Sequence, residues 1–270
     1  MMHFALRGTA AAGRRKAAHA RSASHPCHCQ CHPVHARLDA GVRALRAWPS
    51  ASAADGPSGL ARVEAVLAVL GEFLALPQAA AALRDDATAC DRFLTLADAY
   101  GSFEQALLAL KQSVAQLRAG GRLGDGTMVA ASLRARGRAE KELCGLAVAM
   151  RHASRHAVLA PADAADGEVA RVVAEAAAAT ASASEAIFLW CAAMPPDVSS
   201  VVQTVPSSAW LARLRVVPAA KKAVSLPETA AALERLEERI GELESGSEKV
   251  FSSLLQARVS LLNIHNTLYL

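Results

Sequence analysis

The stretch that decides the fold is the C-terminal segment "LPETAAALERLEERIGELESGSEKVFSSLLQARVSLLNIHNTL", residues 226–268. Small and apolar residues return along it at steps that alternate between three and four, which is the a/d pattern of a helix over about six heptads. A single helix over residues 227–268 would be about 63 Å long at 1.5 Å per residue. The positions of this heptad seam are Leu226, Thr229, Leu233, Leu236, Ile240, Leu243, Ser247, Val250, Leu254, Ala257, Leu261, Ile264 and Leu268.

Two glycines interrupt the helix-forming residues of the segment. Gly241 and Gly246 each cost about 1 kcal/mol relative to alanine, so both one long coiled-coil-like helix and a hairpin are open. The seam can pack inside the chain's own bundle or pair with another chain as a coiled coil. We expect the first and keep the second as the alternative.

The composition of the whole chain is that of an all-α protein. Hydrophobic residues make up 53% of the 270 residues but aromatic ones only 4%, which favours helices over strands. We expect an elongated helical bundle over residues 33–270 behind a disordered tail over residues 1–32. The helical segments indicated by apolar stripes and by Gly and Pro breaks are 34–48, 58–76 with Ser58 as its cap, 78–117 with an irregularity at 100–102, 127–157, 168–194, and a short helix between Pro206 and Pro218.

Positive charge is concentrated in the N-terminal tail. The net charge is +4, and residues 1–38 contribute +6 because they hold six basic residues and no acidic one. Attraction to anionic lipid would therefore come mainly from this tail, within a Debye length of about 8–10 Å, and nucleic acid is not an expected partner. An acid-free leader is also typical of an organelle transit peptide. We expect a cytoplasmic protein and keep peripheral membrane attachment and organelle targeting as alternatives.

The same tail contains the densest group of metal-ligand residue types, "CHCQCH" at residues 27–32. A structural zinc site usually takes two ligands from a C-x₂₋₄-C knuckle and two from elsewhere in the chain. Here the three thiols lie at i, i+2 and i+4, which is a thiolate-clustering spacing, and no second pair follows at the 12–20 residue distance that would close a finger. We therefore expect a passive tail and no cofactor, with opportunistic Zn²⁺ or Cu(I) binding as the alternative. The candidate ligands for that alternative are Cys27, His28, Cys29, Cys31 and His32.

No catalytic motif is present in the sequence. There is no P-loop, dinucleotide-binding glycine fingerprint or nucleophile elbow, and the glycine-rich "AGGRLGDG" (119–126) lacks the Lys-Ser/Thr that binds phosphate. His152 and His156 lie one helical turn apart, but the general-base glutamate of a zinc-protease H-E-x-x-H helix is missing. We expect no enzymatic activity and interpret the two histidines as facing solvent.

Two further stretches are candidates for contacts with other molecules. Arg134, Arg138 and Lys141 fall at i, i+4 and i+7, so they share a helix face that suits anionic lipid or an acidic partner, a solvated face being the alternative. The most apolar run, "AIFLWCAAM" (186–194), is far shorter than the about 20 residues that span a bilayer, and we predict a core helix there.

The final motif of the chain is the most distinctive. "VFSSLLQARVSLLNIHN" (250–266) resembles the closing motif of the plant BYPASS-type family, whose shared region is a domain of unknown function. The Cys/His cluster is not part of the family's pattern, and Gly137 and alanines stand in the basic helix where lysines are usual. Weaker matches in the family's order are "HARSAS" (19–24), His32-Pro33, "LRAW" (45–48), "FLALPQAAAAL" (73–83), "SLRARGRAEKEL" (132–143) and "SSAWLARL" (207–214).

The resemblance implies a plant-specific helical protein without enzymatic activity. Members of the family are linked to root and shoot development and, in some branches, to secretory or membrane-associated partners. We therefore predict a non-enzymatic adaptor that binds protein partners through its helical surfaces, with a peripheral membrane-associated factor as the alternative. Within the closing motif the candidate interaction residues are Leu254, Arg258, Leu261 and Leu262.

Overall fold

A computed structural model describes five parts of the chain: residues 33–50, 55–84, 86–157, 165–194 and 226–266. Helices account for the regular structure in these parts, and they contain no strand, so the all-α prediction is confirmed for them. The predicted disordered tail and the predicted short helix between Pro206 and Pro218 lie outside the described residues. The elements are α1 (Pro33–Ala47), a 3₁₀ turn (Trp48–Ser50), α2 (Gly56–Leu74), α3 (Pro77–Leu83), α4 (Ala87–Leu123), α5 (Gly126–Ala157), α6 (Ala165–Ala192) and α8 (Leu226–Asn266).

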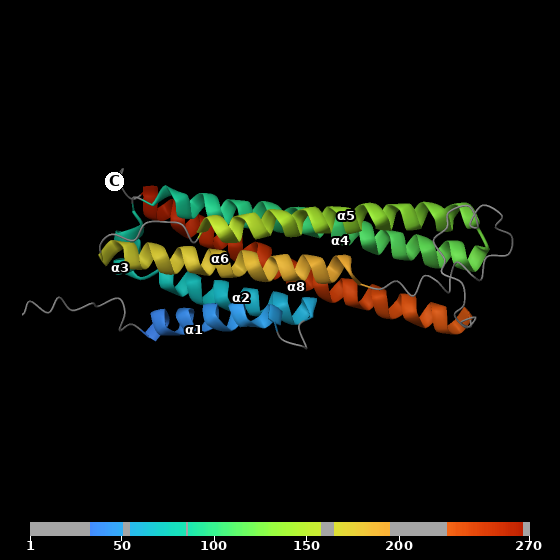
Figure 1. The fold of residues 1–270 in the computed structure, drawn as a ribbon, viewed down its shortest axis with the longest axis horizontal. Helices are drawn as coiled ribbons and strands as arrows, with labels where there is room; N and C mark the ends of the chain where they lie inside the picture. The colour runs from blue at the N-terminus through green and yellow to red at the C-terminus, as the bar shows by residue number, and fades with distance from the viewer. Residues whose placement is uncertain (1–32, 51–54, 85, 158–164, 195–225, 267–270) are drawn as a thin grey trace, which may run out of the picture.

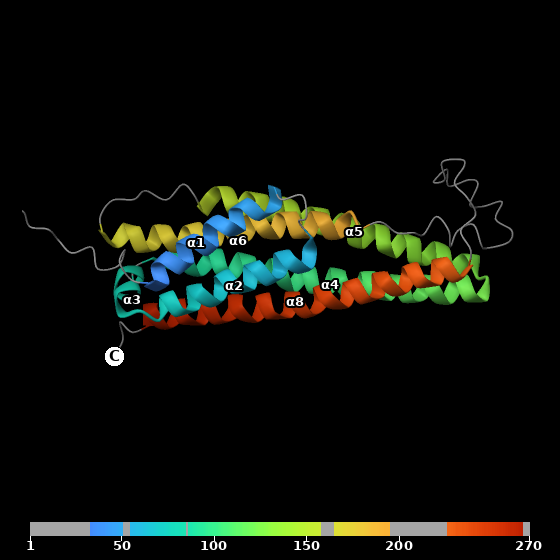
Figure 2. The ribbon, with the colours of Figure 1, turned by 90° about the horizontal axis from the view of Figure 1, so that it is seen from below.

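The helices pack side by side into an elongated bundle (Figure 1). α4 packs against both α5 and α8, α2 joins α8 to α6, and α1 lies across α2 and α6. Figure 2 shows α8 along one edge of the bundle and α1 on the opposite side. One contiguous apolar core runs through all of these helices.

α6 is the most enclosed helix because α1, α2, α3, α4 and α5 all contact it. Alanines fill much of its surface, and those from Ala176 to Ala179 are all buried. A methyl side chain lets neighbouring backbones approach closely, so a helix with alanine on most sides can be surrounded. Larger residues, among them Ile187 and Phe188, close the core toward its C-terminal end.

α6 is also the one described helix whose length and composition alone would let it cross a membrane. The stretch that passes this test is residues 167–192, with 72% of its most apolar window buried inside the protein. α2 and α3 pass the same test only when taken together, and they meet at a bend of 89°. Burial at this level agrees with the prediction of a core helix for residues 186–194.

The heptad seam of α8 packs inside the chain's own bundle, as predicted. Leu243, Val250 and Leu254 are fully buried against α2 and α4. α8 is continuous, so the hairpin alternative is wrong. Gly246 lies against α2, where a Cβ atom would come within 3.0 Å of Cδ1 and 3.1 Å of Cβ of Leu60. The seam ends Leu226, Thr229 and Leu268 fall among residues whose side chains are not described.

The prediction of one helical segment over residues 78–117 with an irregularity at 100–102 is wrong: the chain is interrupted elsewhere, and the helix ends later. The chain divides after α3, where Asp86 caps α4 by accepting a hydrogen bond from the backbone N–H of Thr88 at 3.1 Å. Residues 100–102 lie inside α4, because buried Tyr100 and Phe103 anchor both sides of Gly101 in the core. α4 extends to Leu123 and ends at Gly124, whose φ of 68° is a left-handed conformation that glycine adopts without strain.

α2 begins earlier than predicted, and its cap is Asp55 rather than Ser58. An Asp55 side-chain oxygen accepts the backbone N–H of Ser58 at 2.7 Å. The first turn is tightly enclosed, since a Cβ on Gly59 would lie 2.4 Å from Cη2 of Trp48. Helix propensity and capping rules apply to either residue, so only the tertiary packing distinguishes the two starts.

Candidate functional site

The basic face of α5 is built by residues Arg134, Arg138 and Lys141. All three are exposed, and no ion pair found in the described residues involves them. They share one side of α5 because they are four and three residues apart. The structure therefore brings this predicted trio together as one surface, which we call the basic face.

Arg136 lies between these residues in sequence but points into the protein. Its side chain is 7% exposed, and its Nε donates to Oε1 of Glu140 at 2.7 Å. Its Nη2 donates to the backbone carbonyl of Met194 at 2.6 Å, just past the end of α6. A guanidinium suits this place because the last carbonyls of a helix lack partners and carry partial negative charge. The sequence pattern does not reveal this role, since Arg136 differs from its basic neighbours only by its angular position on α5.

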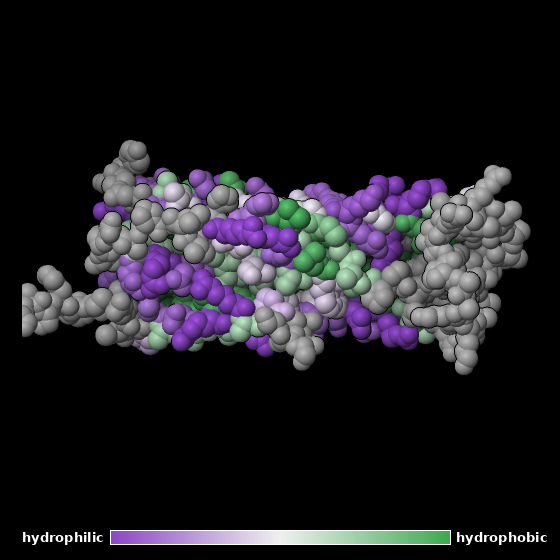
Figure 3. Space-filling view, in the orientation of Figure 1, coloured by the Kyte–Doolittle hydropathy of each residue, from purple (hydrophilic) through white to green (hydrophobic). Residues whose placement is uncertain are grey.

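The rest of the outer surface of α5 is mixed in character. Arg151 pairs with Glu185 of α6 at 2.7 Å, and Val148 is 47% exposed. Figure 3 shows hydrophobic residues gathered over the middle of α5 and the adjoining part of α6, with hydrophilic surface around them. Among the described residues of α6, Leu189 is the large apolar residue that is exposed, at 39%.

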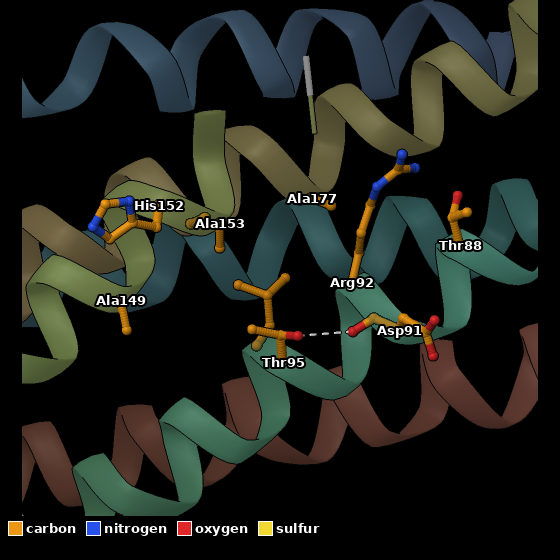
Figure 4. A pocket seen from close by; sticks show the side chains of 10 residues that line it. Thr88, Asp91, Arg92, Thr95, Ala149, His152, Ala153 and Ala177 are labelled. Atoms are coloured by element: carbon orange, nitrogen blue, oxygen red, sulfur yellow. Dashed lines mark hydrogen bonds between the residues drawn. The ribbon is translucent and has the colours of Figure 1, made fainter. Parts of the chain in front are cut away.

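A groove of about 500 Å³ lies between α4, α5 and α6 (Figure 4). Its floor consists of small or apolar side chains, including Leu96, Ala149 and Ala177. His152 lies at one end, whereas Asp91 and Arg92 lie at the other. The side chain of His156 is not described, so the predicted histidine pair is placed only in part.

The polar groups in this groove do not form an acid–base pair. The hydroxyl of Thr95 donates to the backbone carbonyl of Asp91 at 2.9 Å, a bond within α4 itself. His152 belongs to the opposite wall, away from the Asp91 carboxylate (Figure 4). General acid–base catalysis needs its partners within hydrogen-bond reach. The groove instead offers an apolar floor with separated polar ends, which suits contact with an apolar side chain.

The cysteines with shifted pKa values are protected rather than activated. Burial raises the pKa of the Cys191 thiol, and burial together with nearby Asp91 raises that of Cys90. A thiol whose pKa is raised carries less of the nucleophilic thiolate at neutral pH. Tyr100 is similar: burial raises its pKa, and its hydroxyl lies 3.0 Å from Oγ of Ser184 in the core.

The closing motif of α8 divides its candidate interaction residues between core and surface. Leu254 and Leu261 are fully buried among the chain's own helices, so in this fold they are not available to a partner, and the prediction for them is wrong. Arg258 is half-buried and Leu262 is 38% exposed. Leu255 and Val259 are exposed as well and are not among the predicted residues, although their spacing to Leu262 (i, i+4, i+7) is visible in the sequence.

No group of three or more His, Cys, Asp or Glu side chains suited to a metal ion occurs in the parts of the chain that the structure describes. The predicted candidate ligands, Cys27 to His32, lie outside those parts. The alternative of opportunistic metal binding by the tail therefore stays a prediction.

These features define the class of the protein. It is an all-helical bundle with a surface groove and a basic face, and its described residues contain no paired catalytic groups. A family model described as Protein BPS1 matches residues 59–264, which is more than half of the chain. The chain therefore belongs to the Protein BPS1 family. No curated protein and no solved structure matches it. The matched region runs from the first turn of α2 almost to the end of α8.

Proposed function

We propose that this chain is a non-enzymatic helical adaptor that acts in root and shoot development of plants, in the cytoplasm. The observation that carries the proposal is the basic face of α5, where Arg134, Arg138 and Lys141 are exposed together without a carboxylate partner among the described residues. Charges left unpaired on one helix face are available to an acidic partner.

The chemistry of the remaining surface supports a binding role over catalysis. The groove of Figure 4 holds its histidine and its carboxylate at opposite ends. Burial raises the pKa of the Cys90 thiol of α4, which is not among the residues that line the groove. Binding needs only a complementary surface, whereas acid–base or nucleophilic catalysis needs groups in mutual contact.

An acidic helix is the partner that the basic face fits best. Carboxylates spaced at i, i+4 and i+7 would meet Arg134, Arg138 and Lys141 in turn. Between them in sequence, Arg136 points inward and is bonded to Glu140 and to the carbonyl of Met194, so it does not contribute to this face. Charge of this kind contributes mainly to the association rate and to specificity.

A peripheral membrane-associated factor of secretory or signalling pathways is the second candidate. The same basic face carries this alternative, because each basic residue near an anionic bilayer contributes about 1 kcal/mol. Loss of all three charges would then weaken adsorption by about 3 kcal/mol, or about a hundredfold.

Vesicle binding separates the two candidates. Full-length chain is mixed with vesicles containing phosphatidylserine, and the variant R134Q/R138Q/K141Q is compared with R62Q/R84Q/R235Q, which removes the same charge from scattered exposed sites. The adaptor proposal expects weak adsorption that these two variants change equally. Adsorption lost about a hundredfold in the first variant alone, and abolished by a few hundred millimolar salt, would favour the membrane candidate instead.

Proximity labelling in plant tissue then tests the adaptor itself. The wild type and both triple variants are compared for their labelled proteins. We expect the variant of the basic face to lose a defined set of partners that the scattered variant keeps. An unchanged set in both variants would contradict a role for the basic face.

A further inference from the structure

Thr88 carries an exposed hydroxyl at the start of α4, and acidic residues surround it in sequence. It is the second residue of the helix. Asp85 and Asp86 precede it, and Asp91 follows it by three positions. Acids on both sides of a threonine, with one at the third position after it, are the charge pattern that acid-directed protein kinases select. The stretch "DDATACD" (85–91) is therefore a candidate phosphorylation motif.

The position of Thr88 in the helix makes its hydroxyl reachable by a kinase. A kinase holds the residues around the acceptor in an extended form, so a helical acceptor must first be opened locally. The first backbone N–H groups of a helix have no partner within it, and that of Thr88 is bonded to the Asp86 side chain at 3.1 Å. Opening α4 from this end therefore costs less than opening it inside.

Other hydroxyls that have an acid three positions after them lie inside helices. Thr95 has Asp98 at this position, but its hydroxyl donates to a backbone carbonyl at 2.9 Å, about two turns into α4. Ser245 has Glu248 at this position and is exposed, but it lies near the middle of α8. Each of these sites requires a helix to be opened internally, so the structure favours Thr88 over both.

An unpaired arginine lies where it can receive a phosphate on Thr88. Arg92 follows Thr88 by one turn, and both residues line the groove between α4, α5 and α6. Arg92 is half-buried, and no ion pair or hydrogen bond involves it in the residues that the structure describes. Figure 4 shows the two side chains on the same side of α4, whereas the Asp91 carboxylate points away from the guanidinium. A guanidinium at i+4 suits a phosphothreonine dianion as a hydrogen-bond donor.

We propose that Thr88 is phosphorylated by an acid-directed protein kinase and that the phosphate pairs with Arg92. In the transfer, Oγ1 of Thr88 attacks the γ-phosphorus of ATP and the bond from that phosphorus to ADP breaks. ADP leaves, and the hydroxyl proton passes to the catalytic base of the kinase. The hydrogen bond of 2.5 Å from this hydroxyl to Oδ1 of Asp86 is lost. This end of the groove then carries a net negative charge, which changes the partner residues that the groove accepts.

Phosphorylation of the folded, full-length chain tests the site. The chain is incubated with casein kinase II, ATP and Mg²⁺, and the modified residues are mapped by mass spectrometry. We expect phosphate on Thr88, added about tenfold more slowly in Asp91→Asn, because this variant lacks the acid at the third position. Asp98→Asn removes another exposed acid of α4 and is the matched control, with an unchanged rate at Thr88.

Thermal unfolding tests the pairing with Arg92. Wild type and Arg92→Gln are each compared with and without phosphate on Thr88, and far-UV circular dichroism checks that both are folded. The phosphate repels the neighbouring Asp86 carboxylate, and Arg92 offsets this repulsion in the wild type alone. We therefore expect phosphorylation to lower Tm by about 2–4 °C more in Arg92→Gln than in wild type.

Two results would overturn the inference. The first is a folded chain in which Thr88 stays unmodified, or is modified at the same rate in Asp91→Asn, since neither fits a site selected by its acids. The second is an equal change of Tm in wild type and Arg92→Gln, which would exclude Arg92 as the receiver of the phosphate. R134Q/R138Q/K141Q is expected to be phosphorylated like the wild type, so this inference and the proposed function fail separately.

Discussion

The two halves of α8 share one buried seam but face solvent with opposite chemistry. Residues 226–249 contain ten charged side chains, whereas residues 250–266 contain one. In the first half Glu237 binds Arg118 at 2.9 Å and Glu244 binds Lys111 at 2.5 Å, both partners being on α4. In the second half Phe251 and Arg258 occupy the heptad positions of Glu237 and Glu244, and Leu255, Val259 and Leu262 are the exposed apolar residues beside them.

The difference between the halves separates folding from recognition. The seam residues Leu243 and Leu254 are equally buried, so both halves contribute to stability by the same apolar burial. The outer residues contribute little to the monomer, because exposed ion pairs are worth about 0–1 kcal/mol and exposed leucines lose little on truncation. The outer residues of the two halves can therefore differ without a large cost in stability, and they are available for contacts with other molecules.

Truncating a buried residue of the seam should give the largest loss in the free energy of unfolding, and the loss should be similar in both halves of α8. Leu243→Ala and Leu254→Ala each leave a cavity in a fully buried site, and we expect each to cost about 2–5 kcal/mol in the free energy of unfolding. Chemical denaturation measures it, with exposed Val148→Ala as the control. A seam variant that costs no more than this control would show that its half of α8 is not part of the core.

The two glycines of α8 should respond in opposite directions. Gly241 has no atom within 4 Å of a built Cβ, so Gly241→Ala should stabilise the helix by about 0.5–1 kcal/mol. Gly246→Ala would press on Leu60 of α2, and we expect the same gain to be cancelled or reversed. Denaturant midpoints of the two variants measure this. Equal stabilisation of both would mean that α2 and α8 are not held at this close approach.

The boundary between the halves carries a smaller, pH-dependent effect. Burial, and then the neighbouring Glu248, raises the pKa of Glu104, and Oε1 of Glu104 has no hydrogen-bond partner. A carboxyl whose pKa is raised by folding destabilises the protein at neutral pH and ceases to do so once both states are protonated. Glu104→Gln should therefore raise the melting temperature near neutral pH, and the gain should vanish below the ordinary pKa of 4.5. A gain that persists there would assign the effect to packing.

Much of the bundle could be predicted because its helices carry clear periodic patterns. The seam of α8 repeats over about six heptads, and Leu38, Val42 and Leu45 of α1 are buried as their stripe predicts. The sequence does not predict the break between α3 and α4, because residues 84–86 include no Gly or Pro. Gly101, a stronger helix breaker, instead indicates a break that does not occur. Buried Tyr100 and Phe103 override that glycine, and they can do so only when α6 is in contact.

The candidate site was less predictable than the fold for the same physical reason. A pattern of charges shows which residues share a helix face, so Arg134, Arg138 and Lys141 were found. It does not show which face turns inward, so the role of Arg136 at the end of α6 was missed. Likewise, the motif at the end of α8 identifies the family, but the motif alone predicts Leu254 and Leu261 as contact residues although they are buried.

The amino-acid sequence alone determined the helical class, the seam of α8 and the family, because periodicity and local propensity act within a few residues of the chain. The tertiary structure decided which side of each helix is buried and where the helices stop. It also separated Leu255, Val259 and Leu262 from their buried neighbours. Those outcomes depend on residues far apart in the chain competing for the same core, and only the packed bundle brings them together.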